Sequence, residues 1–283
     1  RGSGPTRWTA TQGAAYTRRA MDLGAIDLFL FDIDGVFLAG KEQPRLVSGR
    51  RILPALRERD VPFRLVTNTS THSSKHLADS LGALGIDVVA EEIHSALDAT
   101  VRAAKERHPG GRCFVVGERG LCEAATSAGL TVVEAPPADL VLLGLCRDVD
   151  YGLLNRAARC LLDGAALLAC HRNRLWLDDD GKALSCGCWL AALELAAGVC
   201  AEIFGKPTAA FFDAARRPFD APARRCLMVG DDLDSDIAGA QQAGMHAALA
   251  LTGKTSREAA AGHEVVPDLW LDEVDDLVEL LPR

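Results

Sequence analysis

Short, continuously hydrophobic runs alternate with amphipathic segments along most of the chain. Runs of this kind are typical of strands that are buried on both faces of a sheet. We expect strands at residues 26–32, 63–67, 113–117, 140–145, 166–169, 226–230 and 246–251. Because strands that alternate with helices form βαβ units, the pattern predicts an α/β fold with mostly parallel strands.

The segments between these runs carry apolar residues at three- and four-residue spacing, the period of an amphipathic helix. Residues 52–59 also read as helical, provided that the helix begins near Pro54, since proline suits a first turn. We therefore expect helices at residues 52–59, 74–84, 93–107, 119–128, 151–162 and 189–201.

Three of the expected strands end in polar residues. In open α/β sheets, ligands bind beyond the carboxyl ends of the strands, so these residues should meet at one edge. This convergence, rather than any single motif, predicts a functional site there. The residues are Asp32 and Asp34, then Thr67 and Asn68, then Asp231 and Asp232.

The first strand leads into Asp32-Ile33-Asp34-Gly35. If the chain turns at Gly35, both carboxyl groups can face one cavity. Asp32 could then attack phosphorus as a nucleophile, and Asp34 could transfer protons to and from the oxygens that leave and attack. A strand followed by an ordinary polar turn would have the same sequence.

Two further motifs could bind phosphate. The run from Thr67 to Ser70 precedes an expected helix, where hydroxyl and backbone N–H groups can cradle an anion, although the same residues also suit a plain helix N-cap. Lys206, in Gly205-Lys206-Pro207, could neutralise phosphate charge and hold the carboxylate of Asp32. A solvated surface lysine is the simpler interpretation of Lys206 alone.

Acidic residues crowd the loop after the strand at residues 226–230. Such density is costly through mutual repulsion unless a cation offsets it, and ligands that are all oxygen suit Mg²⁺. The alternative is an acidic loop that caps a helix through Asp234 or Ser235. The four acids are Asp231, Asp232, Asp234 and Asp236.

Composition narrows the class of protein. The 283-residue chain has 48% hydrophobic residues and a net charge of −8, which argues against binding to nucleic acid or to an anionic membrane. No apolar run approaches the roughly 20 residues that span a bilayer. The nine scattered cysteines do not suggest a disulfide framework. We therefore expect a cytoplasmic globular protein.

Taken in order, the motifs resemble those of the haloacid dehalogenase superfamily of aspartyl-phosphate phosphatases. The match is to the subfamily with a large α/β cap, which includes 4-nitrophenylphosphatase-like, nucleotide, phosphoglycolate, pyridoxal-phosphate and phospholysine/phosphohistidine/pyrophosphate phosphatases. It runs from about residue 26 to 281 and includes the run at 161–165. The resemblance implies a Rossmann-like core, with an N-terminal extension at 1–25, core segments at 26–91 and 191–283, and an inserted cap at 92–190.

The resemblance also implies roles for the site residues. Asp32 would be the nucleophile and Asp34 the general acid and base. Mg²⁺ would lie between Asp32, the main-chain carbonyl of Asp34 and Asp231. The implied phosphate-binding residues are Thr67, Asn68 and Lys206, and the implied supporting acids are Asp232 and Asp236.

The cap would choose the substrate. His171, Arg172 and Arg174 occupy its expected substrate-facing loop and would suit an anionic or polar leaving group, although a basic surface loop would look the same. Cys170, Cys186 and Cys188 lie near this loop, and with His171 they could form a zinc or redox site, but their spacing is not a standard zinc pattern.

The sequence thus predicts a Mg²⁺-dependent phosphatase that acts on a small phosphorylated metabolite. A pyrophosphatase or phosphoamidase would use the same nucleophile, and a phosphotransferase would replace water with an acceptor alcohol. A non-catalytic binding protein on the same fold is the alternative from a different class. Dimerisation through the cap is compatible with the sequence but not indicated by it.

Overall fold

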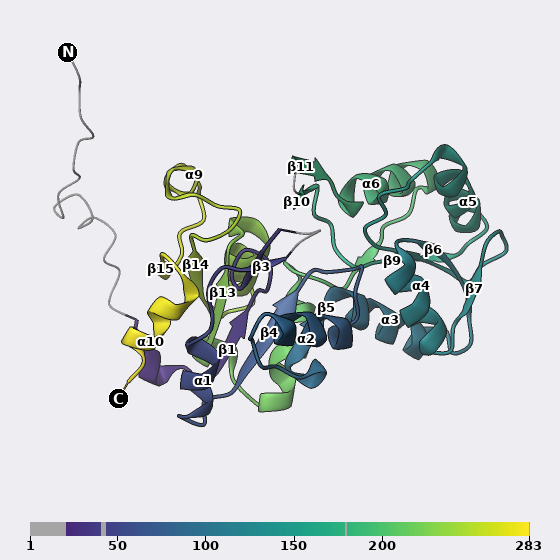
Figure 1. The fold of residues 1–283 in the computed structure, drawn as a ribbon. Coiled ribbons are helices and arrows are strands. Elements are labelled where there is room, and N and C mark those ends of the chain that lie inside the picture. The colour runs from purple at the N-terminus through teal and green to yellow at the C-terminus, as the bar shows by residue number, and fades with distance from the viewer. Residues whose placement is uncertain (1–20, 41–43, 179, 283) are drawn as a thin grey trace, which may run out of the picture.

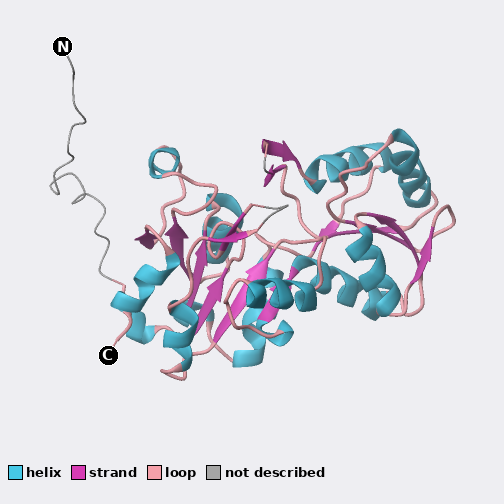
Figure 2. Cartoon of the chain, in the orientation of Figure 1, coloured by secondary structure: helices cyan, strands magenta, loops and turns pink. Residues whose placement is uncertain are grey.

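The computed structural model describes residues 21–40, 44–178 and 180–282, which form two α/β units side by side (Figure 1). Each unit is built on its own sheet, and all the pairings within both sheets are parallel. Helices cover both faces of each sheet (Figure 2). The α/β fold with a parallel-sheet core is therefore confirmed.

The larger sheet has the strand order β15-β14-β13-β1-β4-β5. Side chains of β1 alternate between two apolar clusters, because successive residues of a strand point to opposite faces: Phe29 and Phe31 enter one cluster, and Leu28 and Leu30 enter the other. The strands are β1 (Leu28–Phe31), β4 (Phe63–Thr67), β5 (Ile93–Ser95), β13 (Cys226–Gly230), β14 (His246–Ala250) and β15 (Leu269–Leu271).

Two groups of helices bury their apolar sides on this sheet. Those that pack with Phe29 and Phe31 are α1 (Ile52–Arg57), α2 (Ser74–Ala83) and α10 (Leu277–Leu280), and η1 (Leu23–Ala25) contributes Leu23. Those that pack with Leu28 and Leu30 are α7 (Ala209–Arg216), the π-helical turn η5 (Leu233–Ala238), α8 (Gly239–Gln242) and α9 (Arg257–Ala261).

The smaller sheet has the strand order β12-β9-β8-β6-β7 and forms the cap. Its strands are β6 (Arg112–Val116), β7 (Thr131–Val133), β8 (Leu140–Leu143), β9 (Ala166–Ala169) and β12 (Glu202–Ile203). One face is covered by α3 (Ala96–Arg107) and α4 (Arg119–Ser127), and the other by α5 (Tyr151–Leu162) and α6 (Cys186–Ala197).

Two short antiparallel hairpins lie outside these sheets. The first pairs β2 (Leu38–Ala39) with β3 (Arg45–Leu46), and the second pairs β10 (Leu175–Asp178) with β11 (Gly181–Leu184). The second hairpin extends from the cap toward the core (Figure 1). The remaining short turns are η2 (Ala90–Glu92), η3 (Arg217–Phe219), η4 (Ala223–Arg225) and η6 (Val274–Asp276).

The expected strands all form, with ends shifted by a few residues at most, but one expected helix is wrong at its start. Residues 93–95 are strand β5, which pairs with β4, and the helix begins only at Ala96. Ser95 sets this boundary, because its side chain accepts a hydrogen bond from the Asp98 N–H as an N-cap.

The helix expected at residues 189–201 also has different ends. It starts at Cys186 and stops at Ala197, because Gly198 adopts the left-handed conformation (φ 66°) that commonly ends helices. None of the helices formed by the described residues is long and apolar enough to cross a membrane.

The predicted cap limits, residues 92 and 190, can be compared with the sheet to which each neighbouring element belongs. Strand β5 belongs to the core sheet, whereas α6 and β12 pack with the cap sheet. These memberships favour a cap that runs from about Ala96 to Ile203, and we propose those limits. Most of the predicted extension at 1–25 lies outside the described residues; of its last residues, Leu23 packs in the core.

Candidate active site

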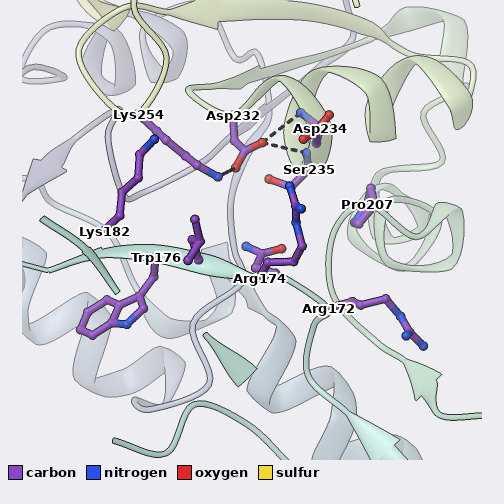
Figure 3. Close-up of a pocket in the computed structure, with 11 residues that line it drawn as sticks. Arg172, Arg174, Trp176, Lys182, Pro207, Asp232, Asp234, Ser235 and Lys254 are labelled. Carbon is purple, nitrogen blue, oxygen red and sulfur yellow. Dashed lines mark hydrogen bonds and ion pairs between the residues drawn. The ribbon is translucent and has the colours of Figure 1, made fainter. Parts of the chain in front are cut away.

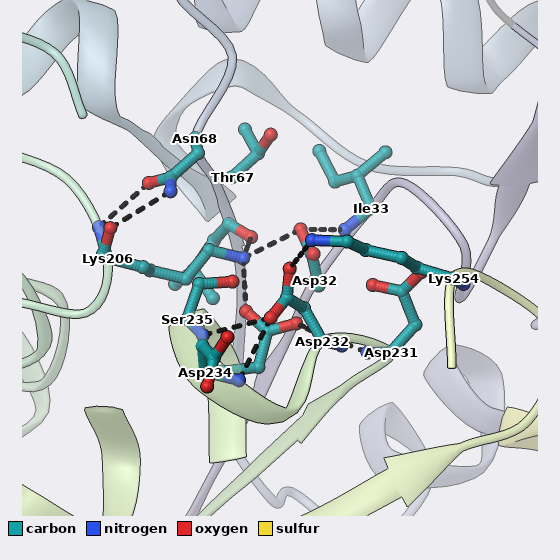
Figure 4. Close-up of polar contacts among 12 residues, drawn as sticks. Asp32, Ile33, Thr67, Asn68, Lys206, Asp231, Asp232, Asp234, Ser235 and Lys254 are labelled. Atoms are coloured by element: carbon teal, nitrogen blue, oxygen red, sulfur yellow. Dashed lines mark hydrogen bonds and ion pairs between the residues drawn. The ribbon is translucent and has the colours of Figure 1, made fainter. Parts of the chain in front are cut away.

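The carboxyl ends of β1, β4 and β13 meet at a cavity of about 260 Å³ between the core and the cap. The structure thus brings together the polar residues that the strand ends predicted, and Figure 4 shows all of them except Asp34. The lining includes Asp32, Asp34, Thr67, Asn68, Lys206, Asp231, Asp232 and Lys254 from the core, and Asn173, Leu175 and Trp176 from the cap.

Lys206 lies at the centre of the buried charges. Its side chain is 1% exposed, and its Nζ lies 2.9 Å from Asp32 Oδ1 and 2.7 Å from Asp236 Oδ1. Burial would lower the pKa of Lys206, but the two carboxylates outweigh it and hold the pKa above its usual value. The ammonium group therefore stays charged, and the alternative of a solvated surface lysine is wrong.

Asp32 is held in a fixed orientation at the end of β1, where its Oδ1 accepts a hydrogen bond of 2.7 Å from the Ile33 N–H. Burial raises the pKa of Asp32 well above its usual value; Lys206 opposes this shift, and nearby acids, first Asp236, add to it. Asp32 therefore needs positive charge beside it in order to act as a carboxylate at neutral pH.

Asp34 follows on the same turn and lines the same cavity. Gly35 permits the turn, with φ at +77°, and also leaves room for Asp231: a Cβ at Gly35 would lie 2.0 Å from Asp231 Oδ2. The sharp turn thus delivers both carboxyl groups of the Asp-x-Asp motif to one space, as the sequence predicts.

Asp231 is the second acid that faces Asp32. Burial, and then the charge of Asp236, raises the pKa of Asp231 to about 7. Its Oδ2 accepts a hydrogen bond of 2.6 Å from the Lys254 N–H, and a Cβ at Gly253 would lie 2.0 Å from the same oxygen. The carboxylate of Asp231 is thus enclosed by two glycines and oriented by one backbone donor.

One group of potential metal-binding side chains emerges from the part of the chain that the structure describes. One carboxylate oxygen each from Asp32, Asp231 and Asp236 lie within 4.8 Å of one another. Asp236 is the least available of the three, because its Oδ2 accepts the N–H groups of Asp231 and Asp232 at 3.2 and 3.1 Å and its Oδ1 faces Lys206. This arrangement suits the supporting role predicted for Asp236.

Asp232 makes two kinds of contact. Its Oδ1 accepts the N–H groups of Asp234 and Ser235 at 2.9 and 3.1 Å and so caps η5, and its Oδ2 pairs with the Lys254 ammonium. Burial would raise the pKa of Asp232, but Lys254 and the backbone donors outweigh it and lower the pKa. The loop therefore does cap a helix, but through Asp232 and not through Asp234 or Ser235, while Asp231 faces the cavity.

Sequence reasoning missed Lys254. It follows β14 at the same edge of the sheet as the other site residues, after Leu251-Thr252-Gly253. The strand at 246–251 was expected, so the argument from converging strand ends could have included the residues that follow it.

Thr67 and Asn68, at the end of β4, make different kinds of contact. Thr67 is buried, and its Oγ1 accepts the Thr69 N–H at 3.0 Å. The Asn68 amide is bound to the backbone of Lys206, whose N–H it accepts at 2.7 Å and whose carbonyl it reaches at 3.0 Å. Ser73 is the actual N-cap of α2, so the plain N-cap alternative for residues 67–70 is wrong.

The three substrate-loop residues predicted in the cap have different surroundings. His171 is buried outside the catalytic cavity against Cys186, whose Sγ lies 3.3 Å from its Nδ1, and burial, followed by the charge of Lys206, lowers the pKa of His171 to about 4. Arg172 forms two contacts of 2.7 Å with Glu194. Arg174 is exposed beside a neighbouring cavity.

These surroundings correct the prediction for His171 as a substrate contact, because the side chain is neutral and buried behind the loop. The cap residues that line the catalytic cavity are Asn173, Leu175 and Trp176 instead. No pattern in the sequence marked them, since a loop's path is set by tertiary contacts.

The cysteines near this loop form no metal site with His171 among the described residues, where every cysteine is a free thiol. Burial raises the pKa of Cys170 to about 12 and also raises that of Cys186. Thiols with raised pKa values are poor nucleophiles, so the geometry favours a packing role for both.

Comparison with known proteins identifies the family. A model described as haloacid dehalogenase-like hydrolase matches residues 29–131, and one described as HAD-hydrolase-like matches residues 203–277. Haloacid dehalogenase-like hydrolase domain-containing protein 2 of Mus musculus is 35% identical over 248 residues, which cover 87% of this chain and 92% of that protein. The chain therefore belongs to the haloacid dehalogenase-like hydrolases.

Two further relatives define its class within that family. Chronophin of Rattus norvegicus is 32% identical to this chain, and the alignment covers 91% of this chain and 88% of chronophin. The structure of the p-nitrophenyl phosphatase from Archaeoglobus fulgidus superposes with a TM-score of 0.83 at 30% sequence identity. The superposition covers 90% of this chain and 99% of the phosphatase. The protein is a phosphoric monoester hydrolase of this family.

Proposed function

We propose that the protein hydrolyses a small phosphate monoester with the help of Mg²⁺, through a phosphoryl group carried transiently by Asp32. The observation that carries the proposal is the buried carboxylate of Asp32, fixed 2.9 Å from the Lys206 ammonium in a cavity that also holds Asp34. A nucleophile, a proton donor and a cation for phosphate are then within one small space.

The reaction has two steps. In the first, a carboxylate oxygen of Asp32 forms a bond to phosphorus while the bond to the ester oxygen breaks, and Asp34 gives that oxygen its proton. In the second, water attacks phosphorus, Asp34 takes a proton from the water, and the bond between phosphorus and Asp32 breaks. Inorganic phosphate and the alcohol leave, and both aspartates return to their starting states.

The buried acids fit a bound Mg²⁺. Burial and mutual repulsion raise the pKa values of Asp32 and Asp231, so a cation between the two carboxylates would stabilise their charged forms. Carboxylate oxygens are also ligands that Mg²⁺ prefers. Asp32, Asp231 and the main-chain carbonyl of Asp34 would hold the ion. When bound, it would offset the repulsion between the phosphate and Asp32.

The remaining residues position these groups. Lys206 neutralises charge on Asp32 and the phosphate, and Asn68 fixes the backbone from which Lys206 projects. Since phosphoryl transfer depends mainly on in-line positioning and charge neutralisation, this fixed frame supports the proposal. Trp176 and its cap neighbours, Asn173 and Leu175, line the cap side of the cavity, where they would limit the access of water to the reacting groups.

The test compares Asp32→Asn with a matched control, Asp27→Asn, a half-exposed carboxylate just before the same strand that pairs with Arg225, away from the cavity. Phosphate release is measured with Mg²⁺ on sugar phosphates, nucleotides, phosphoglycolate, pyridoxal phosphate and pyrophosphate, and circular dichroism checks the fold. We expect Asp32→Asn to abolish turnover and Asp27→Asn to keep it. Near-normal activity in Asp32→Asn, or no release from any of these compounds by the unchanged protein, would overturn the proposal.

A further inference from the structure

Two neighbouring cavities share lining residues with the catalytic cavity, and Trp176 lines all three. One has a volume of about 410 Å³ and shares Asn173, Trp176 and Lys254 with the catalytic cavity. The other, of about 370 Å³, shares Asp34, Thr67 and Trp176 with it. A leaving group larger than the catalytic cavity therefore has two directions in which to extend.

The two side cavities differ in the balance of charge on their walls. In the cavity of 370 Å³, Arg147 is matched by Glu118, with contacts of 2.6 and 3.0 Å. In the cavity of 410 Å³, Arg174 and Lys182 make no ion pair with any other described residue. The larger cavity therefore has an excess of positive charge.

The other charges of the larger cavity do not cancel this excess. Lys254 is paired with Asp232, and Arg172 is paired with Glu194. Figure 3 shows Lys182 and Lys254 on the same side of the cavity, with the Arg172 side chain directed away from Asp232. Asp234 also lines the cavity, but its side chain is largely exposed, and a single carboxylate can offset only one of the two cations, Arg174 and Lys182.

We propose that this cavity is an anion subsite, in which Arg174 and Lys182 bind a second phosphate or carboxylate group of the substrate. The inference rests on the proposed phosphatase function and names its substrate class: phosphate monoesters whose leaving group is itself anionic. The ester oxygen stays in the catalytic cavity beside Asp34, and the rest of the leaving group passes Trp176 into the subsite.

The backbone that carries Arg174 and Lys182 is held in place by hydrogen bonds and close packing. The Arg174 carbonyl accepts the Ser185 N–H at 2.9 Å and the Cys188 thiol at 3.3 Å, and the next turn of chain, at Gly187, packs so closely that a Cβ there would lie 2.6 Å from the Asn173 carbonyl. Lys182 is on β11, paired with β10, which carries Trp176. These contacts hold the loop and hairpin together over the cavity.

The net charge of the whole chain strengthens the case. At −8, the protein repels a substrate with two anionic groups, so a local cluster of unmatched cations is needed to draw one in. Exposed charges of this kind act over about 10 Å at 0.1 M salt and are screened at higher ionic strength.

The experiment uses two substrates of similar size, 3-phosphoglycerate and glycerol 3-phosphate, which differ mainly by a carboxylate in place of an alcohol. Arg174→Gln, Lys182→Gln and the double variant are compared with Lys105→Gln, which removes an exposed charge from α3. We expect kcat/KM for 3-phosphoglycerate to fall about 3- to 10-fold in each single variant, and values for glycerol 3-phosphate to stay within about 2-fold.

A separate arm identifies the source of the anion. Inorganic phosphate is titrated into assays with glycerol 3-phosphate. If phosphate changes the rate without competing with this substrate, and the double variant loses the effect, the cavity binds an anion, but a free anion rather than a group of the substrate. Equal losses on both substrates, or no loss on either, overturn the subsite. Calorimetric binding of both substrates to Asp32→Asn repeats the comparison without turnover, so absence of activity on every ester would count against the proposed function alone.

Discussion

Asp236 is the residue whose removal should affect stability most strongly within the site. It is fully buried, and its two oxygens contact the Lys206 ammonium and the N–H groups of Asp231 and Asp232. The contact with Lys206 at 2.7 Å is an ion pair rather than an aligned hydrogen bond. In Asp236→Ala, Lys206 keeps only Asp32 as a charged partner, and two buried N–H groups lose their acceptor.

The expected magnitude follows from these losses. Removing one partner of a buried ion pair typically costs about 3–5 kcal/mol, because the other charge stays buried without compensation. Asp236→Asn keeps an oxygen that can accept the two N–H groups, so its loss should be smaller than that of Asp236→Ala. Asp234→Ala, in the same loop but with an exposed side chain, should change the free energy of unfolding by no more than about 0.5 kcal/mol.

The assay is urea unfolding of the three variants and the unchanged protein with a chelator present, so that bound metal does not add to the stability. The order should be Asp236→Ala below Asp236→Asn, below Asp234→Ala and the unchanged protein. A loss of less than about 1 kcal/mol in Asp236→Ala would show that Lys206 does not depend on this carboxylate, and the proposed charge balance of the site would then be wrong.

Three further changes test separate contacts. In Gly253→Ala, a Cβ 2.0 Å from Asp231 Oδ2 displaces that carboxylate, so Mg²⁺ affinity measured by calorimetry should fall about 10- to 100-fold. Asn68→Ala frees the Lys206 backbone and should lower kcat up to about 100-fold with the fold intact. Burial, and then nearby arginines, lower the pKa of His94 to about 3. As pH falls from about 6.5 toward 3, His94 gains a proton in the unfolded chain but not in the folded one, so its contribution to the free energy of unfolding falls by up to about 1.4 kcal/mol per pH unit. Urea unfolding of His94→Leu at several pH values should lack this contribution to the slope.

The catalytic centre was accessible from sequence because its residues follow strands with strong patterns. Asp32 and Asp231 follow runs without a charged residue, Thr67 ends a run that is apolar except for Arg64, and parallel strands bring their carboxyl ends to one edge. Lys206 was less marked, since it follows β12, a strand of only two residues in the cap sheet. The family resemblance, and not the local pattern, placed it in the site.

Partners within the site were harder to predict than the site itself. Asn68 was expected to bind phosphate, and the structure adds its contacts with the Lys206 backbone across 138 residues of sequence. Asp232 and Lys254 likewise meet only because two neighbouring strands, β13 and β14, end together. Such pairings depend on the register of a sheet, which a single sequence does not specify.

The substrate loop shows why specificity resisted prediction most. His171, Arg172 and Arg174 lie within four residues, yet one is buried against Cys186, one is paired with Glu194 and one borders an open cavity. Hydrogen bonds from the start of α6 to the loop carbonyls fix which way each residue turns, and those donors lie more than ten residues further along the chain. Of these three basic residues, Arg174 is the one left for the proposed anion subsite, and Lys182, the second cation of that subsite, comes from the far strand of the hairpin. The charge that faces the cavity is therefore set by the fold of the cap rather than by the loop's composition.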